Sequence, residues 1–198
     1  MCRINFDFNI MNGRCKRASL FFCTDKHEKK FDTSLIFSQK FCRFGYVQVI
    51  FCRPFSNKGK PFPTTFWLTC PYLIKLAGKI ESDGGVKELE NYIKINGLEK
   101  KWRKYNFLHQ VLKLKFLNKN LCSFMRKYHG KIFKSLIRSG IGGMKYDDKN
   151  IFVKCLHLQT ASFLGLGFHP AEEWLKTKGL CGDCDEALCS RNFAVKLN

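Results

Sequence analysis

The residues best suited to chemistry in this sequence are its cysteines, of which the 198-residue chain has eleven. Two of them form a Cys-x-x-Cys pair in Cys181-Gly182-Asp183-Cys184, and Cys189 follows five residues later. A turn of this spacing brings two sulfur atoms to one metal ion, and its glycine permits a tight backbone. One pair supplies half of a zinc site, so the remaining ligands must come from elsewhere. A reduced tail without a ligand and redox chemistry are the alternatives for this pair.

A second set of candidate ligands is dispersed along the chain and comprises Cys42, Cys70, Cys155 and His157. Residues i and i+2 of a helix point about 200° apart, so Cys155 and His157 could share one ion only in extended backbone. Otherwise His157 has another neighbour or is a hydrogen-bonded residue of the core. A cysteine beside a histidine could alternatively act as a nucleophile, with Cys70 or Cys155 as the thiol. The bases considered for Cys70 are His157, His109 and His129.

The charge of the chain is strongly positive and unevenly distributed. Lys and Arg number 35 against 16 Asp and Glu, which gives a formal net charge of +19. Residues 100–146 contain thirteen of the basic residues and no acidic residue, whereas residues 151–198 are neutral overall. A segment without internal carboxylates needs salt or an anionic partner to screen its field. We therefore expect nucleic acid or an acidic protein as the partner, unless the composition reflects only AT-rich coding DNA.

Several classes of protein are excluded by what the sequence lacks. No run approaches the roughly 18 consecutive apolar residues of a membrane span, and the N-terminal residues do not have the pattern of a signal peptide. The sequence has no P-loop, no Gly-x-Gly-x-x-Gly after a strand, no His-Glu-x-x-His and no Gly-x-Ser-x-Gly motif. We therefore expect a cytoplasmic protein with reduced thiols that binds a ligand rather than catalysing a reaction. The oligomeric state stays open.

The elements that must position these residues predict an α+β protein, with a small N-terminal β element followed by a mostly helical single domain. Residues 46–51 and 64–69 are rich in β-branched and aromatic side chains and predict a hairpin across a turn at Gly59. Periodic apolar residues and Gly or Pro breaks predict helices at 72–80, 86–95, 101–117, 128–137, 151–164 and 171–176. We expect residues 1–38 to be a poorly defined extension, residues 39–176 to form the domain, and residues 177–198 to form a Cys-containing tail.

Several segments of the sequence resemble a known family. The residues from Lys60 to Pro71, KPFPTTFWLTCP, are similar to the PFPT-aromatic-aromatic-LTCP segment of the bacterial family known as domain of unknown function 501. Val153 to His157, VKCLH, resembles a second signature, and Lys79 to Gly84 resembles the family's helix ending in LE-x-x-G. The resemblance extends over about residues 40–175, although Ser162 stands where many relatives have a second histidine. The family has no established biochemical function.

The resemblance implies that Cys42, Cys70, Cys155 and His157 belong together, because all four lie in the family's signature segments. Three thiolates and an imidazole suit a tetrahedral zinc ion or an iron–sulfur cluster. With the tail included, the candidate metal ligands are Cys42, Cys70, Cys155, His157, Cys181 and Cys184. The sequence thus predicts a protein that binds a metal or a cluster through Cys and His and presents a basic surface to an anionic partner. A cysteine-dependent enzyme and a plain protein-interaction module are the alternatives.

Overall fold

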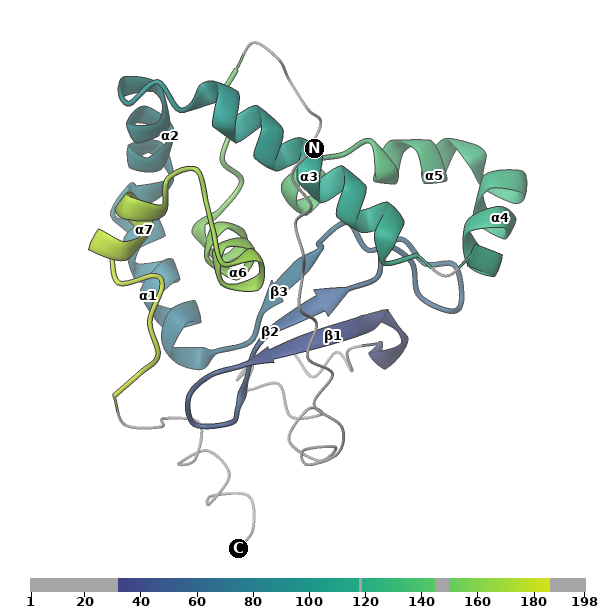
Figure 1. Cartoon of the computed structure of the whole chain (residues 1–198), viewed down its shortest axis with the longest axis horizontal. Helices are drawn as coiled ribbons and strands as arrows, with labels where there is room; N and C mark the ends of the chain where they lie inside the picture. The colour runs from purple at the N-terminus through teal and green to yellow at the C-terminus, as the bar shows by residue number, and fades with distance from the viewer. Residues whose placement is uncertain (1–31, 118, 145–149, 186–198) are drawn as a thin grey trace, which may run out of the picture.

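The structure, a computed structural model, describes residues 32–117, 119–144 and 150–185 of the chain (Figure 1). Most of the predicted N-terminal extension, up to residue 31, and the end of the tail, with Cys189, lie outside these residues. Within the described part, three strands come first and seven α-helices follow. The α+β class predicted from the sequence is therefore confirmed.

The sheet is antiparallel, with its strands in the order β1 (Ile36–Phe41), β2 (Val47–Cys52) and β3 (Phe66–Leu68). β2 and β3 form the predicted hairpin, in which Ile50 is opposite Trp67. The sequence does not predict β1, because the centre of this strand is polar, Ser38-Gln39-Lys40, and most of its residues stay partly exposed at the edge of the sheet. Pairing with β2, rather than local pattern, makes this segment a strand.

The α-helices in the described residues are α1 (Pro71–Ser82), α2 (Gly85–Ile95), α3 (Glu99–Lys115), α4 (Lys119–Tyr128), α5 (Gly130–Ile137), α6 (Leu156–Leu166) and α7 (Glu172–Thr177). Short 3-10 turns, η2 (Thr33–Leu35) and η3 (Ile141–Gly143), precede β1 and follow α5. The predicted helices correspond to all of these α-helices except α4. None of the described helices combines the length and the hydropathy that crossing a bilayer requires.

Helix α6 begins at Leu156 and not at Ile151, as the sequence predicts. The side chains of Ile151 and Val153 are buried ahead of the helix, and the Val153 backbone N–H donates to Glu90 Oε1 at 3.0 Å. These contacts hold the segment before Leu156 outside the helix.

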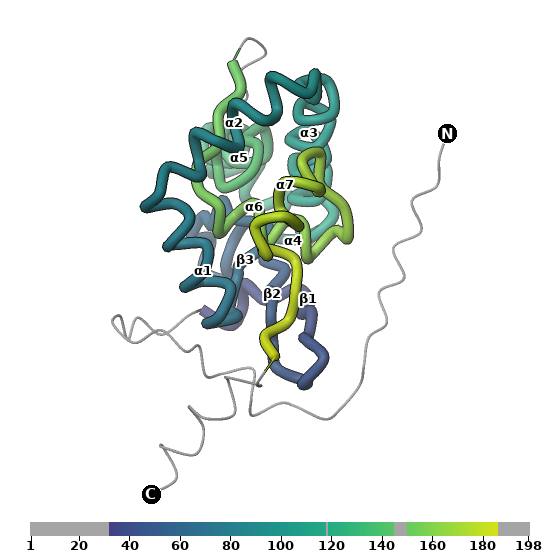
Figure 2. The backbone as a smooth tube through the Cα atoms, turned by 90° about the vertical axis from the view of Figure 1, so that its left-hand side faces the viewer, coloured from purple at the N-terminus to yellow at the C-terminus, as the bar shows by residue number. Residues whose placement is uncertain are grey.

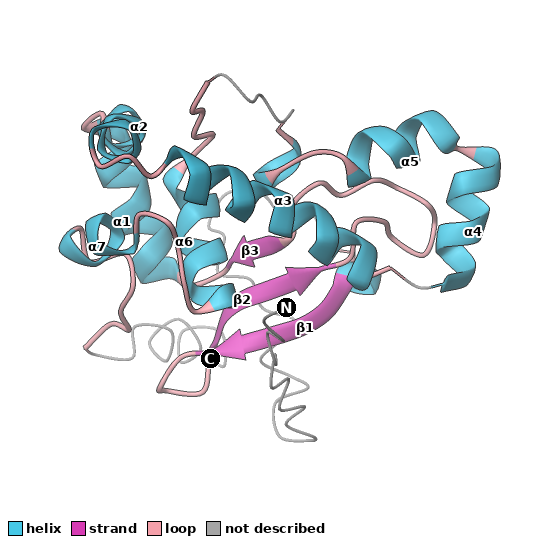
Figure 3. Cartoon of the chain, turned by 45° about the horizontal axis from the view of Figure 1, so that its top comes forward, coloured by secondary structure: helices cyan, strands magenta, loops and turns pink. Residues whose placement is uncertain are grey.

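Helix α6 lies at the centre of the fold, against β3, β2 and α1. Figure 3 shows the helices gathered on one face of the sheet. Gly165 lets α6 approach β3 closely, because a Cβ atom at this position would lie 2.5 Å from the Phe66 ring. Leu156 and Ala161 of α6 are completely buried. This packing puts the first turn of α6 beside the last turn of α1.

Candidate metal centre

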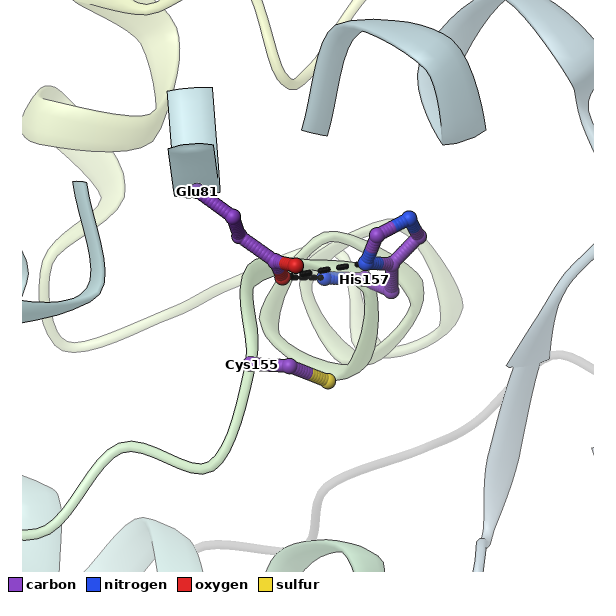
Figure 4. Close-up of side chains that lie close together, drawn as sticks. All are labelled: Glu81, Cys155 and His157. Atoms are coloured by element: carbon purple, nitrogen blue, oxygen red, sulfur yellow. Dashed lines mark hydrogen bonds and ion pairs between the residues drawn. The ribbon is translucent and has the colours of Figure 1, made fainter. Parts of the chain in front are cut away.

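Three side chains meet where the end of α1 approaches the beginning of α6 (Figure 4). Glu81 is in the last turn of α1, Cys155 is the N-cap of α6, and His157 is in the first turn of α6. A carboxylate oxygen, a sulfur and an imidazole nitrogen from these residues all lie within 4.8 Å of one another. Among the described residues, this is the one group of three or more His, Cys, Asp or Glu side chains that is close enough to hold a metal ion.

The backbone at Cys155 explains how two residues at positions i and i+2 can face the same group. Cys155 has φ −164° and ψ 158°, which is extended backbone, and the helix begins only at Leu156. A helix that started at Ile151 would point Cys155 and His157 in different directions. The later start of α6 therefore allows the two side chains to act together.

Glu81 binds both the backbone and a side chain at the N-terminus of α6. Its Oε1 accepts hydrogen bonds from the backbone N–H of Leu156 and, at 3.3 Å, from that of His157. The same oxygen accepts a hydrogen bond from His157 Nδ1 at 3.0 Å. The first N–H groups of a helix have no partner within the helix and carry partial positive charge, so a carboxylate is stabilised there. Glu81 thus caps α6 from another helix.

The imidazole of His157 donates hydrogen bonds from both ring nitrogens. Nδ1 binds Glu81, and Nε2 donates to the backbone carbonyl of Ile74 at 3.1 Å. Gly78 lies beside the ring, where an added Cβ atom would be 4.0 Å from His157 Cε1. Two oxygen acceptors require a proton on each nitrogen. The pKa of His157 is accordingly raised to about 9, first by the nearby Cys155 side chain and then by Glu81, although burial acts in the opposite direction.

This geometry suits a metal ion that takes the place of the Nδ1 proton. The Nε2–H bond to a backbone carbonyl fixes the ring and leaves Nδ1 as the ligand atom. In most metal-binding histidines the second ring nitrogen makes a hydrogen bond of this kind. Zinc accepts sulfur, nitrogen and oxygen ligands at tetrahedral geometry. The side chains of His157 and Glu81 are 33% and 24% exposed, so an ion can reach them from solvent. The group can hold an ion with three ligands and leave one position open.

The structure brings Cys155 and His157 together but puts the other predicted ligands elsewhere. Cys70 is the N-cap of α1, whereas Glu81 is in the last turn of the same helix. The two positions are separated by about 16 Å along the helix axis. Burial raises the pKa of the Cys70 thiol, and the nearby Cys184 and Cys42 thiols raise it further. The predicted ligands are therefore divided between the two ends of α1.

The histidines considered as bases for Cys70 have other surroundings. His109 is 1% exposed, and its Nε2 and the hydroxyl of Ser162 are 2.7 Å apart. Tyr105 completes this buried network with its own hydrogen bond to Ser162 at 2.6 Å. Burial lowers the pKa of His109 to about 3. His129 is exposed at the start of α5, with its ring 5.9 Å from that of Phe124. The Ser162 network therefore belongs to the core.

Glu81 is the member of the metal group that the sequence alone does not identify. The one available signal is its place in the segment from Lys79 to Gly84, which resembles a family signature. No spacing rule connects this segment to Leu156, which it meets 75 positions later. The contact depends on how α1 and α6 pack against each other.

Comparison with known protein families supports the resemblance seen in the sequence. Residues 38–177 match the family described as protein of unknown function (DUF501). No curated protein and no solved structure matches the chain. The matched residues include Glu81, Cys155 and His157, whereas Cys181 and Cys184 lie beyond them. Because the match covers more than half of the sequence, the chain belongs to the DUF501 family.

Proposed function

We propose that this protein binds a zinc ion through Glu81, Cys155 and His157. The observation that carries the proposal is the convergence of their three ligand atoms, which all lie within 4.8 Å of one another. Neighbouring ligand atoms around a tetrahedral zinc ion are about 3.5 Å apart, because each lies about 2.0–2.3 Å from the metal. Small rotations of the three side chains would bring them to one ion.

The types of ligand atom favour zinc over the other metals considered. Iron–sulfur clusters are held mainly by thiolates, whereas this group offers one thiol, one imidazole and one carboxylate. Magnesium and calcium prefer oxygen ligands alone. A metal ion of intermediate softness such as zinc accepts all three donor types.

A zinc ion held by three side chains keeps one coordination position for a water molecule or for a ligand from a partner. Structural zinc sites are closed by four protein ligands, whereas sites that bind or activate a small molecule keep the open position. The partial exposure of Glu81 and His157 is in keeping with an open site. We therefore propose zinc-dependent ligand binding at the junction of α1 and α6.

Metal analysis of the full chain, purified without oxygen and without chelators, tests this proposal. Glu81→Gln and Cys155→Ser should each lower the zinc content by about one ion per chain, because zinc affinity depends on every ligand. Cys122→Ser is the matched control, since Cys122 is another partly buried free cysteine, in α4. Equal zinc contents in the parent protein and in both ligand variants would overturn the proposal.

The proximity of the Cys155 sulfur to the His157 imidazole also supports the alternative of a cysteine-dependent enzyme. In a triad, however, the base contacts the nucleophile through one ring nitrogen and the acid through the other. Here one nitrogen of His157 lies within 4.8 Å of both the sulfur and the carboxylate. This arrangement favours shared coordination over a proton relay. Rapid alkylation of Cys155 that zinc does not slow would favour the nucleophile instead.

We also propose that the surface of helices α3, α4 and α5 binds a polyanion, with nucleic acid as the preferred class. Residues 100–144 contain twelve Lys and Arg and no acidic residue, and ten of the twelve are exposed. Two exposed aromatic rings, Phe124 and Tyr128, lie in the same segment with centroids 5.0 Å apart. Cationic side chains that neutralise phosphates, beside aromatic rings on which bases stack, bind single-stranded nucleic acid. Binding titrations with single-stranded DNA and with an acidic polypeptide distinguish the two classes of partner.

A further inference from the structure

The last described segment of the chain lies across the turn between β1 and β2 (Figure 2). The Asp183 carboxylate accepts hydrogen bonds from the Arg43 backbone N–H at 3.0 Å and from Gln48 Nε2 at 2.9 Å. The Arg43 guanidinium donates to the carbonyl of Cys184 at 2.8 Å. These bonds hold the Cys-x-x-Cys segment on one end of the sheet. Cys42 directly precedes Arg43 and is therefore brought close to Cys184.

Cys70 reaches the same end of the sheet from β3. Thr69 donates its backbone N–H to the carbonyl of Gln48 at 3.0 Å, and Gln48 also holds the Cys-x-x-Cys segment. Cys42 and Cys184 are near enough for their charges to act on the Cys70 thiol. Cysteines from three separate segments of the chain thus lie at the same end of the sheet.

We propose that Cys42, Cys70, Cys181 and Cys184 bind a second zinc ion, which fastens the C-terminal segment to the sheet. Four thiolates at tetrahedral geometry make a closed, structural zinc site. Cys181 precedes Cys184 by three positions and is partly buried, so the Cys-x-x-Cys turn can supply two of the ligands. This site is separate from the open site at Glu81, because the two lie at opposite ends of α1.

The surroundings of the four thiols suit a cation. Cys70 is the N-cap of α1, and the first backbone N–H groups of a helix carry partial positive charge. Partial positive charge at a helix N-terminus favours the thiolate form that a metal requires. The guanidinium of Arg43 lies beside Cys184 and offsets the net negative charge of a four-thiolate zinc site. Among the described residues, the Glu81 group is the one whose three or more ligand atoms all lie within 4.8 Å of one another. The four thiols are farther apart than that, so zinc binding would have to draw the C-terminal segment inwards.

Zinc analysis of the full chain separates this site from the site at Glu81. Cys184→Ser and Cys181→Ser should each remove about one zinc ion per chain, and Glu81→Gln should remove another independently. The double variant Glu81→Gln/Cys184→Ser should have none, whereas Cys122→Ser should have the parent content. Loss of zinc in Cys184→Ser but not in Glu81→Gln would support the four-cysteine site and overturn only the site at Glu81.

A cysteine variant could lose zinc simply because it does not fold, so a second measurement follows the reactivity of the thiols in protein that keeps all four cysteines. In folded Glu81→Gln protein, a chelator should speed the alkylation of Cys70 and Cys184 by about tenfold or more, because zinc-bound thiolates are protected. Mass spectrometry assigns the alkylated residues, and circular dichroism reports whether the fold is kept. An unchanged zinc content in both Cys184→Ser and Cys181→Ser, or an alkylation rate that the chelator does not change, would overturn the site. An iron chromophore in place of zinc would overturn the choice of metal.

Discussion

Glu81 Oε1 accepts a hydrogen bond from His157 Nδ1 at 3.0 Å, although the two residues are 76 positions apart in the sequence. The contact joins the last turn of α1 to the first turn of α6. The same carboxylate oxygen accepts a hydrogen bond from the backbone N–H of Leu156 and so caps α6. One side chain thus completes the metal group and also stabilises the helix that carries its other members.

Two substitutions of Glu81 should distinguish its role as the cap of α6 from its role as a metal ligand. In metal-free protein, Glu81→Ala should lower the free energy of unfolding by about 1–2 kcal/mol, because the first N–H groups of α6 lose their acceptor. Glu81→Gln should cost less, since the amide oxygen can still accept those hydrogen bonds. Urea denaturation measures both values. Equal losses for the two variants would contradict a capping role.

Zinc binding at the open site should strengthen as the pH rises. The pKa of His157 is raised to about 9 in the metal-free protein, so zinc must displace its proton at lower pH. The apparent affinity should therefore rise by up to about tenfold per pH unit for this proton, and the rise should end near the pKa. Competition against a chromophoric chelator in the Cys184→Ser background measures this dependence. An affinity that is independent of pH below 9 would argue against coordination by His157.

Acid should destabilise the folded core through His109 and His169. Burial lowers the pKa of each to about 3, whereas an exposed histidine has a pKa of about 6.5. Below about pH 6.5 the unfolded chain takes up protons that the folded protein does not, so stability is lost as the pH falls toward 3. The slope should reach about 1.4 kcal/mol per pH unit for each histidine. Urea denaturation over this range should show a smaller slope for His109→Gln and His169→Gln.

Lys113 lies in the acid-free segment but does not belong to its surface, since it is only 1% exposed. Its Nζ donates to the carbonyls of Ser139 and Gly140 at 2.8 and 2.9 Å, beyond the end of α5. Lys113→Met should lower the free energy of unfolding by about 1–3 kcal/mol, because these buried carbonyls lose their donor. Lys104→Met, at an exposed position of the same helix, should change it by less than about 0.5 kcal/mol. Thermal or urea unfolding of the two variants tests whether Lys113 stabilises the segment after α5.

Binding of single-stranded DNA should weaken steeply with salt. The logarithm of the affinity should fall with the logarithm of salt concentration by about 0.7 for each phosphate that the protein contacts. Glutamine at three exposed positions of α4 and α5 should reduce this slope, namely Arg126, Lys127 and Lys131. The matched control has glutamine at three exposed lysines outside the acid-free segment, Lys75, Lys79 and Lys94. Equal slopes for the two triple variants, measured by fluorescence anisotropy, would contradict the assigned surface.

Much of the fold follows from local pattern. The hairpin of β2 and β3 and the helices α1 and α2 are predicted correctly, because alternation, helical periodicity and the Gly84-Gly85 break are all local signals. β1 and α4 are not predicted, because their local apolar patterns are weak. The residues of β1 are mostly polar or partly exposed, and α4 buries Met125 alone.

The sequence by itself determined the chemical inventory of this protein: its thiols and imidazoles, the acid-free basic segment, the α+β class and the family signatures. Only the tertiary structure decided which of these residues meet. The late start of α6 at Leu156 points Cys155 and His157 toward one group, and the packing of α6 against α1 adds Glu81 to it. Arg43 and Gln48 bring the Cys-x-x-Cys segment to the other end of α1. The physical reason is that these contacts join positions 75 to 141 residues apart, whereas sequence periodicity extends only over neighbouring turns of a helix or strand.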